Sequence, residues 1–574
     1  ITVTANKIDE DLADVPQSVT VLDRRSLEEK KIERISDVIL EIPNMLINPN
    51  HGVSLNVRGL NTSMFTNNNP VVVYIDGIPY SERYGFNVDF GEVDRVEVLR
   101  GPQGTLYGKD AIGGVINIVT KDPGDEWKGK LGIEYGSHNF FRSTIQVAGP
   151  VRQGSPVFAG VNAQYQRDDG WIENVHPGMS KEADDKNLYR FSSFLLYKPN
   201  DRLSVRFTFS REYDRSNWMS GYGIPSSVPF SAIDRDDAET VDFDVSTVQK
   251  VQTASQSLNV AYRFDDLTLT STTTHSQKKI RGEYDADFGN NPLYAGLYQF
   301  ERTDVDVWTQ EVRASSNNKE GFRWIAGVYA DTDKRNQGPY GMQFPNFDPV
   351  SGAFLGNFSM NAESVTDSRT QAVFGQIMVP LGDRLELTLG GRYQHIEKEM
   401  DLDMYFLPIG MSGEAIYRFS GKRTWDAFLP KAALSFAIND AWKTYVSWSK
   451  GYMPGGFNYF ASSGGIDENS FEPQKSTNYE VGIKGSFDRL RLSASVFYMD
   501  IEDIHVYKSI GSMYLADNAR KAHSQGIELE CSCKLTDELE LSGSVGVIDA
   551  KYDDYDYGAG NLPKIGRASC RERV

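Results

Sequence analysis

From about residue 123 onward, the sequence repeats one pattern: a short polar turn, then roughly ten residues in which apolar and polar side chains alternate. Examples are "YKPNDRLSVRFTFS" (197–210), "VPLGDRLELTLGGRY" (379–393) and "SFDRLRLSASVFY" (486–498). A tilted strand of about ten residues is long enough to cross a bilayer. Long polar segments, such as 212–244 and 284–304, separate the hairpins on the other side. The pattern predicts an antiparallel transmembrane β-barrel with short turns on one rim and long loops on the other.

The alternatives are a large soluble β-sandwich or a propeller, and a helical membrane protein. Aromatic residues near the expected strand ends, among them Tyr445, Trp448, Phe497 and Tyr498, favour a membrane barrel. No repeat has the length of a propeller blade. No run approaches the roughly 18 apolar residues of a spanning helix, which excludes a helical membrane protein.

The first 122 residues have a different rhythm, typical of a small α/β unit. "QSVTVLD" (17–23) alternates like a strand, and "SLEEKKI" (26–32) predicts a helix that a capping box of Ser26 and Glu29 begins. "SDVILEIP" (36–43) predicts a second helix that ends at proline. Four strand candidates follow in "SLNVRGL", "PVVVYIDGIPY", "VDRVEVLRG" and "GGVINIVTK".

Several chemical functions find no support in the residues. The net charge of -19 argues against a nucleic-acid partner. The glycine-rich stretch 96–121 fails as a phosphate loop, because Asp110 follows Gly108-Lys109 and Gln103 stands where the first glycine is needed. No zinc-binding spacing and no catalytic constellation occur. Cys531 and Cys533 would share one face of a strand, so a disulfide between them is not expected.

The chain resembles the TonB-dependent outer-membrane receptors, and within them the pesticin and yersiniabactin-type siderophore receptors. The resemblance rests on "VDRVEVLRGPQGTLYGKDAIGGVINIVTK", "VVVYIDGIPY" and "LNVRGLN" in the first part, and on "SKGYMPGGFNYF", "FEPQKSTNYEVGIKGSF" and "ADNARKAHSQGIELE" later. It implies a plug domain (6–122) inside a 22-stranded type of barrel (123–566) in the bacterial outer membrane. TonB, with ExbB and ExbD, would drive ligand passage. Such a protein is a transporter, not an enzyme, and we expect a monomer surrounded by outer-membrane lipid.

The resemblance also implies two sets of working residues. "ITVTA" resembles a TonB box, formed by Ile1, Thr2, Val3, Thr4 and Ala5, which could add a strand to TonB. Plug arginines would pair with barrel glutamates in a buried cluster, and the motifs place these at Arg58, Arg100, Glu480 and Glu528. Strand parity agrees, because Tyr479 and Val481, like Ile527 and Leu529, would face lipid and turn both glutamates inward. The alternative is two solvated carboxylates in the lumen.

The ligand is less well specified. Plug loops 61–69 and 79–90 and the barrel loops supply aromatic residues and an arginine that suit an anionic, aromatic iron chelate: Phe65, Tyr80, Arg83, Tyr84, Phe86, Tyr213, Trp218, Tyr222 and Tyr340. Each is also compatible with a loop anchor or an interface aromatic. Iron would travel as part of the ligand, with no cofactor and no metal site in the protein. The alternatives are a receptor for cobalamin, haem or a glycan, and a passive porin or surface-binding protein.

The end of the chain departs from the family pattern. "LPKIGRASCRERV" alternates poorly and lacks a terminal aromatic, so we expect 567–574 to be foreign and several strands to be missing. At about 25 residues per strand and loop, roughly seventeen or eighteen strands would remain. Unpaired strand edges inside lipid are costly, so a chain of this extent is not expected to form a closed pore.

Overall fold

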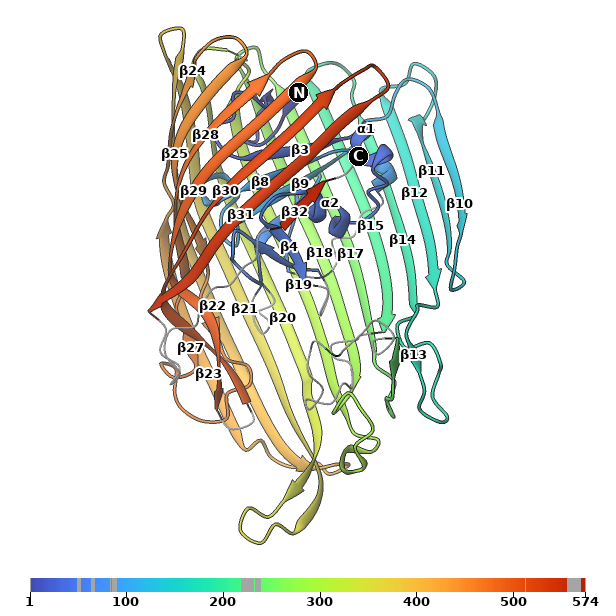
Figure 1. Ribbon diagram of the computed structural model, residues 1–574. Coiled ribbons are helices and arrows are strands. Elements are labelled where there is room, and N and C mark those ends of the chain that lie inside the picture. Colours follow the sequence, from blue (N-terminus) through green and yellow to red (C-terminus); the bar gives the residue numbers. More distant parts are fainter. Residues whose placement is uncertain are drawn as a thin grey trace.

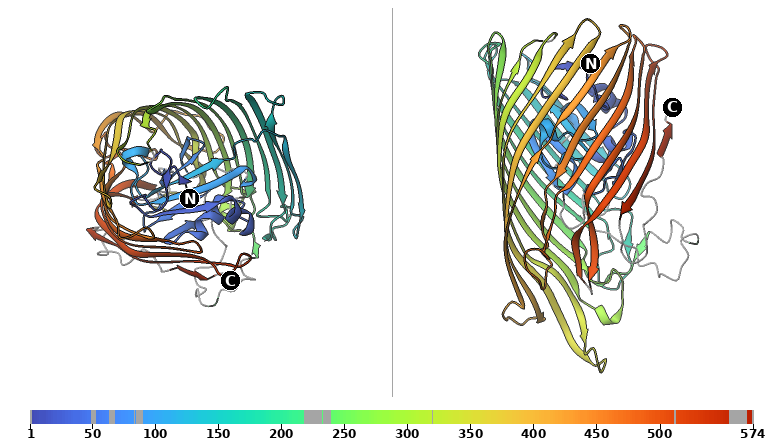
Figure 2. Two further views of the ribbon diagram at one scale, coloured as in Figure 1. Left: turned by 90° about the horizontal axis from the view of Figure 1, so that it is seen from above. Right: turned by 90° about the vertical axis from the view of Figure 1, so that its left-hand side faces the viewer.

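The computed structural model describes residues 2–48, 53–62, 68–82, 84, 90–217, 232, 239–318, 320–510, 513–554 and 569–572. A small N-terminal unit, which we call the plug, lies inside a long curved antiparallel sheet (Figures 1 and 2). The expected domain boundary at residue 122 falls between the last plug strand and the first strand of the sheet. Among the described residues, no helix has the length and apolar character needed to cross a membrane.

The plug is built on a five-stranded sheet with the order β3-β8-β9-β6-β7. Its strands are β3 (Val19–Asp23), β6 (Asn68–Ile75), β7 (Ile78–Glu82), β8 (Val93–Arg100) and β9 (Gly114–Thr120). Two small hairpins accompany it, β1 (Thr2–Val3) with β2 (Glu10–Asp11) and β4 (Met45–Asn48) with β5 (Ser54–Val57). The helical segments are α1 (Arg24–Glu29), α2 (Ile35–Glu41), α3 (Gly104–Tyr107) and η1 (Phe90–Glu92). All the strand candidates of the sequence form strands, and "PVVVYIDGIPY" divides at Asp76-Gly77 into β6 and β7.

Helix α1 begins earlier than expected. Asp23 is its N-cap and accepts a hydrogen bond from the Ser26 amide at 2.9 Å, so Ser26 is inside the helix and is not its cap. Aspartate is a preferred N-cap because its carboxylate satisfies a free amide of the first turn. The predicted capping box at Ser26 and Glu29 is therefore wrong.

The large sheet has nineteen strands among the described residues, and consecutive strands pair in antiparallel fashion except β23 with β24. In its first half these are β10 (Lys128–Tyr135), β11 (Phe141–Pro150), β12 (Val157–Asp168), β14 (Lys186–Tyr197), β15 (Leu203–Asn217), β17 (Val248–Arg263), β18 (Leu267–Asp285), β19 (Tyr298–Ser316) and β20 (Arg323–Phe347). The second half comprises β21 (Phe354–Leu381), β22 (Leu385–Pro408), β23 (Tyr417–Phe428), β24 (Lys431–Ala437), β25 (Trp442–Met453), β28 (Gln474–Ser486), β29 (Leu490–Ile510), β30 (Met513–Lys534), β31 (Glu540–Asp554) and β32 (Ser569–Glu572). Strands β23 and β24 both pair with β22, one after the other, so they continue a single line interrupted at Leu429-Pro430. The four remaining short strands pair in the loops: β13 (Glu173–Asn174) with β16 (Thr240–Val241), and β26 (Gly456–Phe457) with β27 (Ser470–Phe471).

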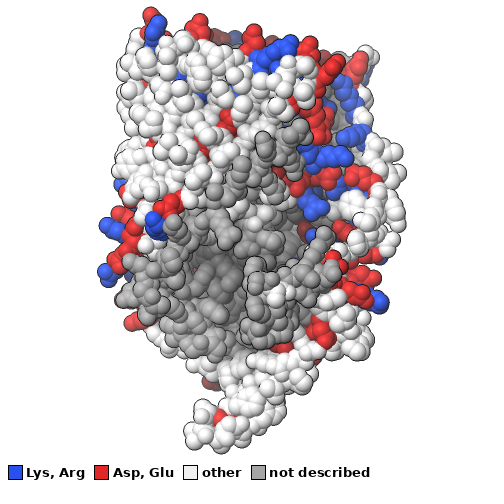
Figure 3. Space-filling model, in the orientation of Figure 1, with Lys and Arg blue, Asp and Glu red and all other residues white. Residues whose placement is uncertain are grey.

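The two faces of the sheet follow the alternation in the sequence. Val373, Val481 and Val496 are each more than half exposed on the outer face of the sheet. The residues that alternate with them along each strand point to the plug. In Figure 3 the upper left of the outer face is mostly uncharged, and charged side chains gather at the upper rim and toward the right. This distribution matches an apolar surface for lipid and a polar lumen.

The turns 151–156, 198–202, 382–384, 487–489 and 535–539 lie at the end where the N-terminus is found, which we call the short-turn rim (Figure 1). The hairpin of β10 and β11 also turns within five residues, 136–140, but at the opposite end. Several strands are much longer than the ten residues expected, and β21 has 28. The segments 212–217, 284–285 and 298–304, expected in loops, belong to β15, β18 and β19, because the hairpins continue as paired strands beyond the bilayer span.

The glycines of 96–121 allow the plug to approach the sheet closely. A Cβ on Gly104 would lie 2.8 Å from Leu429 Cδ1, and one on Gly108, whose φ is +85°, would lie 2.6 Å from Arg392 Nη2. Only glycine fits both the space and the left-handed backbone at Gly108.

Candidate functional site: the contacts between plug and barrel

A buried cluster of two arginines and three glutamates joins the plug to β28 and β30. Arg58 donates to Glu528 through Nε at 2.9 Å and Nη2 at 2.8 Å, and its Nη1 lies 2.8 Å from Glu480 Oε2. Arg100 Nη1 lies 3.1 Å from Glu528 Oε2, and its Nη2 donates to Glu530. The two-pronged contact between Arg58 and Glu528 is the strongest geometry available to this kind of pair. We call these five residues the arginine–glutamate cluster.

The backbone of the plug presents Arg58 to this cluster. The residue lies in a tight turn in which Val57 and Leu60 exchange backbone hydrogen bonds of 3.0 and 2.9 Å. Its φ of +47° is uncommon for a residue with a side chain. The Ser524 hydroxyl on β30 donates to the Arg58 carbonyl at 2.6 Å, which fixes the turn against the sheet.

The surroundings favour charged arginines. Burial alone would lower the pKa of Arg58, but the Glu528 and Glu480 carboxylates outweigh it and raise that pKa above its ordinary value. The guanidinium also lies 4.1 Å from the centroid of the Phe497 ring. Glu480 accepts further hydrogen bonds from the Ser18 amide at 2.8 Å and the Tyr445 hydroxyl at 2.7 Å.

The structure brings all four residues expected in this cluster into contact, and it adds Glu530. Glu530 follows Glu528 by two residues on β30 and therefore points to the same face. The Thr20 hydroxyl donates to it at 2.7 and 2.8 Å. The same parity rule that placed Glu528 would have found it.

A second row of ion pairs, which the sequence did not predict, joins the plug to β18, β19 and β20. Lys109 Nζ lies 2.9 Å from Asp331, and Lys278 Nζ lies 2.8 Å from Glu82. Lys109 lies in the glycine-rich stretch 96–121, which resembles a phosphate loop only superficially. Its ammonium group pairs with a carboxylate of the sheet.

The segment expected as a TonB box is folded into the plug. Thr2 and Val3 pair with Asp11 and Glu10, and the Thr4 amide donates to Glu97 at 2.9 Å. Val3 and Ala5 are buried, and Ile1 lies outside the described residues.

Two charged residues hold the end of this segment against the sheet. Lys7 Nζ lies 2.6 Å from Glu311 and faces the rings of Tyr107 and Phe374. Burial lowers the pKa of Lys7 to about 8, although the Glu311 carboxylate opposes the shift. Glu10 lies 3.5 Å from Arg323, and burial raises its pKa to about 7.

At the other end of the lumen, aromatic side chains gather around Tyr340. Its ring centroid lies 5.0 Å from that of Phe460 and 5.9 Å from that of Tyr459, and these two rings lie 5.0 Å apart. Tyr459 and Phe460 come from the loop between β25 and β28. Both residues lie in "SKGYMPGGFNYF", one of the segments that carry the family resemblance, and neither was expected to contact the ligand. We call these three residues the aromatic triad.

The other candidate ligand residues are placed differently. Tyr80 is buried and donates to Ser255 at 3.0 Å, and the buried Tyr84 hydroxyl accepts from Gln249 at 3.1 Å, so both pack against the sheet and not in an open loop. Tyr213 lies on the outward-facing side of β15 and packs beside Tyr189, whose ring is half exposed. Tyr213 therefore does not face the lumen. Phe65, Arg83, Phe86, Trp218 and Tyr222 lie outside the described residues.

Within the described residues, no group of three or more histidine, cysteine, aspartate or glutamate side chains could hold a metal ion. Cys531 and Cys533 are both free, as their shared parity predicted.

Comparisons with known proteins agree with this architecture. Residues 217–565, more than half of the chain, match the family described as "TonB dependent receptor-like, beta-barrel", and residues 11–115 match "TonB-dependent Receptor Plug Domain". The pesticin receptor of Yersinia enterocolitica is 26% identical over 531 residues, which cover 91% of this chain and 73% of that protein. The vitamin B12 transporter of Vibrio vulnificus is 37% identical over 240 residues, or 40% of this chain and 38% of that protein. The crystal structure of the ferric yersiniabactin uptake receptor from Yersinia pestis superposes with a TM-score of 0.81 at 23% identity, over 96% of this chain and 81% of that one.

Proposed function

We propose that this chain, which belongs to the TonB-dependent outer-membrane receptors, takes up a ferric siderophore or a similar large iron chelate across the bacterial outer membrane. The family consists of transporters and not enzymes. The single observation that carries the proposal is the plug held inside the lumen, with its N-terminal segment at the short-turn rim and an aromatic triad at the other end. A ligand bound at one end is then separated from the site of the TonB pull at the other.

The aromatic triad supports an iron chelate as the ligand. Catechol, phenol and heterocyclic rings stack well on tyrosine and phenylalanine. Arg335 and Lys398 line the same end of the lumen, where Lys398 donates to the Gly455 carbonyl at 2.8 Å and Arg335 pairs with Glu82. Two cations near aromatic rings suit a ligand with negative charge. The relatedness to the ferric-pyoverdine M114 receptor of a Pseudomonas strain points in the same direction.

A cobalamin receptor is the second candidate, favoured by the local match to the vitamin B12 transporter. A passive porin is disfavoured by the plug, whose buried ion pairs fill the lumen.

The test expresses the protein in a host that lacks its own siderophore receptors. Uptake of radioactive iron from a panel of defined ferric siderophores is measured beside uptake of cobalamin, with and without a functional TonB. Uptake of one ferric chelate that disappears without TonB is the expected result. Cobalamin uptake alone would favour the second candidate, and flux independent of TonB would favour a porin.

A further inference from the structure

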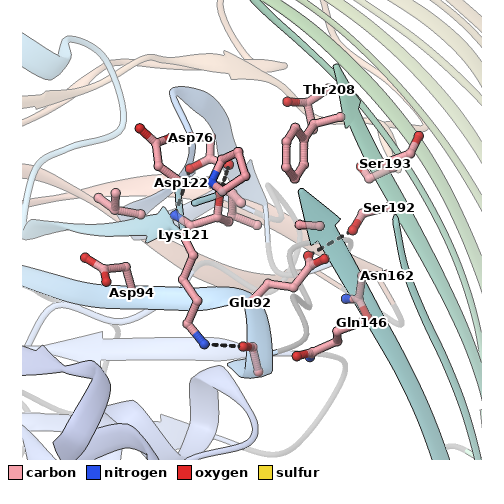
Figure 4. Close-up of a pocket in the computed structure, with 18 of the residues that line it drawn as sticks. Asp76, Glu92, Asp94, Lys121, Asp122, Gln146, Asn162, Ser192, Ser193 and Thr208 are labelled. Carbon is pink, nitrogen blue, oxygen red and sulfur yellow. Dashed lines mark hydrogen bonds between the residues drawn. The ribbon is translucent and has the colours of Figure 1, made fainter. Parts of the chain in front are cut away.

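Two large cavities of the protein differ in the walls that enclose them. One of about 1100 Å³ lies inside the lumen, and Figure 4 shows Glu92 and Lys121 of the plug on one side of it and Ser192 and Thr208 of the sheet on the other. The second, of about 760 Å³, is lined by residues of β17 to β22 and of the segment that follows β22. None of its described lining residues belongs to the plug. We call this second cavity the β17–β22 groove.

The alternation of side chains places the groove on the outer face of the sheet. Its lining residue Lys250 follows Gln249, whose amide donates to Tyr84 of the plug and therefore points to the lumen. Its lining residue Tyr405 follows Met404, which is fully buried on the lumen side of β22. Successive side chains of a strand point to opposite faces, so Lys250 and Tyr405 both point away from the lumen.

One wall of the groove carries three cations in a row. Lys250 on β17 lies directly opposite Arg281 on β18, which lies directly opposite Arg302 on β19. Like charges in opposite positions of neighbouring strands are destabilising. Arg281 pairs with Asp304 at 2.7 Å, whereas Lys250 and Arg302 have no ion pair within the described part of the chain. An anion bound in front of the row would therefore stabilise it.

The outer face around this row has an excess of positive charge. Lys279 joins the three cations, and the neighbouring outward carboxylates are Glu283 and Asp304. Glu301, which also lines the groove, is buried and accepts a hydrogen bond from Tyr284 on the lumen side at 3.3 Å. Four cations thus face two carboxylates, on a chain whose net charge is -19. A local excess of this kind attracts anions.

The other wall of the groove is largely apolar. Tyr405 and Leu407 on β22 line it, together with Ile409 and Met411, which are 40% and 67% exposed. Between the two walls, Asn361 Oδ1 on β21 has no hydrogen-bond partner in the part of the chain that the structure describes. Sugar rings have C–H faces that pack on aromatic and aliphatic side chains, and hydroxyl groups that donate to such an oxygen.

The groove lies just beyond the lipid-facing belt. Trp308 is half exposed on the outer face of β19, where an aromatic residue is typical of the membrane interface. Arg302 is about six residues farther from the short-turn rim, which corresponds to roughly 14 Å along the membrane normal for a strand tilted by about 45°. At this height the membrane consists of lipid headgroups and not of hydrocarbon.

We propose that the β17–β22 groove binds the phosphorylated sugar headgroup of lipopolysaccharide, the glycolipid of the outer leaflet of the outer membrane. A phosphate group lies in front of Lys250, Arg281 and Arg302, because charge-assisted contacts with phosphate are the strongest that such a row can make. The sugar rings lie against Tyr405 and Leu407, and the acyl chains continue over the apolar outer face. The groove is separated from the aromatic triad by the sheet, so the glycolipid binds whichever ligand the lumen carries.

The test compares three variants of the protein, each purified from outer membranes in a mild detergent. Lys250→Gln with Arg302→Gln removes the two cations without ion pairs. Lys334→Gln with Arg369→Gln is the matched control, because these exposed cations of β20 and β21 also point outward but each lies opposite a carboxylate. Lys250→Arg with Arg302→Lys keeps the charge of the row.

Native mass spectrometry measures the binding of three probes at one ionic strength. They are a short-chain lipopolysaccharide of defined structure, the same molecule after removal of its phosphates with hydrofluoric acid, and inorganic phosphate. We expect Lys250→Gln with Arg302→Gln to bind the lipopolysaccharide about tenfold more weakly, the effect of two lost exposed ion pairs. The unsubstituted protein should discriminate against the dephosphorylated probe by a similar factor, and the control and the charge-keeping variant should bind like the unsubstituted protein.

Four results would overturn the proposal. They are an unchanged affinity of Lys250→Gln with Arg302→Gln, an equal loss in the control or in the charge-keeping variant, equal binding of the phosphorylated and dephosphorylated probes, and no binding of lipopolysaccharide by the unsubstituted protein. Displacement of the lipopolysaccharide by millimolar inorganic phosphate would assign the row of cations to a free anion and would also overturn it.

Discussion

Replacing Glu528 with alanine tests how strongly the arginine–glutamate cluster holds the plug. The substitution removes the acceptor of two hydrogen bonds from Arg58, the ion pair of 3.1 Å with Arg100 and a hydrogen bond of 3.3 Å from Asn44. Breaking a buried ion pair by removing one partner costs about 3–5 kcal/mol. Arg58 keeps Glu480 and Arg100 keeps Glu530, so we expect a value near the lower end, about 3 kcal/mol.

Hydrogen exchange followed by mass spectrometry measures this loss locally. A free-energy change of about 3 kcal/mol corresponds to roughly 150-fold faster exchange where exchange proceeds through plug opening. The peptides that report it cover 54–62 and 93–101, and peptides of the sheet serve as internal references. Glu28→Ala is the control, because Glu28 forms a pair with Arg24 on the exposed face of α1 and its loss changes little. Less than threefold acceleration in Glu528→Ala, no different from the control, would refute the reasoning.

Three further predictions follow from the same contacts. The double substitution Glu480→Ala with Glu528→Ala is expected to leave surface binding of ligand intact and to change the uptake rate, and identical uptake kinetics would remove the role in plug release. Val3→Pro takes an amide from the N-terminal segment and bends it, so we expect binding without TonB-dependent uptake, and normal uptake would contradict the assignment of residues 1–5. Burial raises the pKa of Glu10 to about 7 in the folded protein, although Arg323 and Lys431 oppose the shift. The protonated Glu10 therefore stabilises the folded N-terminal segment fully below the ordinary glutamate pKa, and this stabilisation is lost as pH rises to 7. A spin label at Thr2→Cys should become more mobile from pH 5 to pH 7, and Glu10→Gln should flatten that dependence.

The alternation of the sequence was sufficient to predict the sheet and the inward direction of Glu480 and Glu528, because the period of two fixes which side chains share a face. The same rule places Glu530, the last residue of "ADNARKAHSQGIELE", on the inner face beside Glu528. It also places Tyr213, expected in a loop, on the outer face of β15. Tyr80, Tyr84 and Lys109 could not be placed in this way. Their partners Ser255, Gln249 and Asp331 are more than a hundred residues away, and only the docking of the plug inside the sheet brings them together.

The hairpin of β20 and β21 reaches farther from the short-turn rim than any other part shown in Figure 1. A strand of 28 residues is about 95 Å long and, tilted by about 45°, spans about 65 Å along the membrane normal. The hydrocarbon core takes up only about 30 Å of that height. The turn at 348–353, where Val350 is 94% exposed, thus stands well clear of the lipid headgroups. Of the part of the chain that the structure describes, an antibody, a phage or a neighbouring cell would touch this turn first, at a point remote from the buried charges that hold the plug.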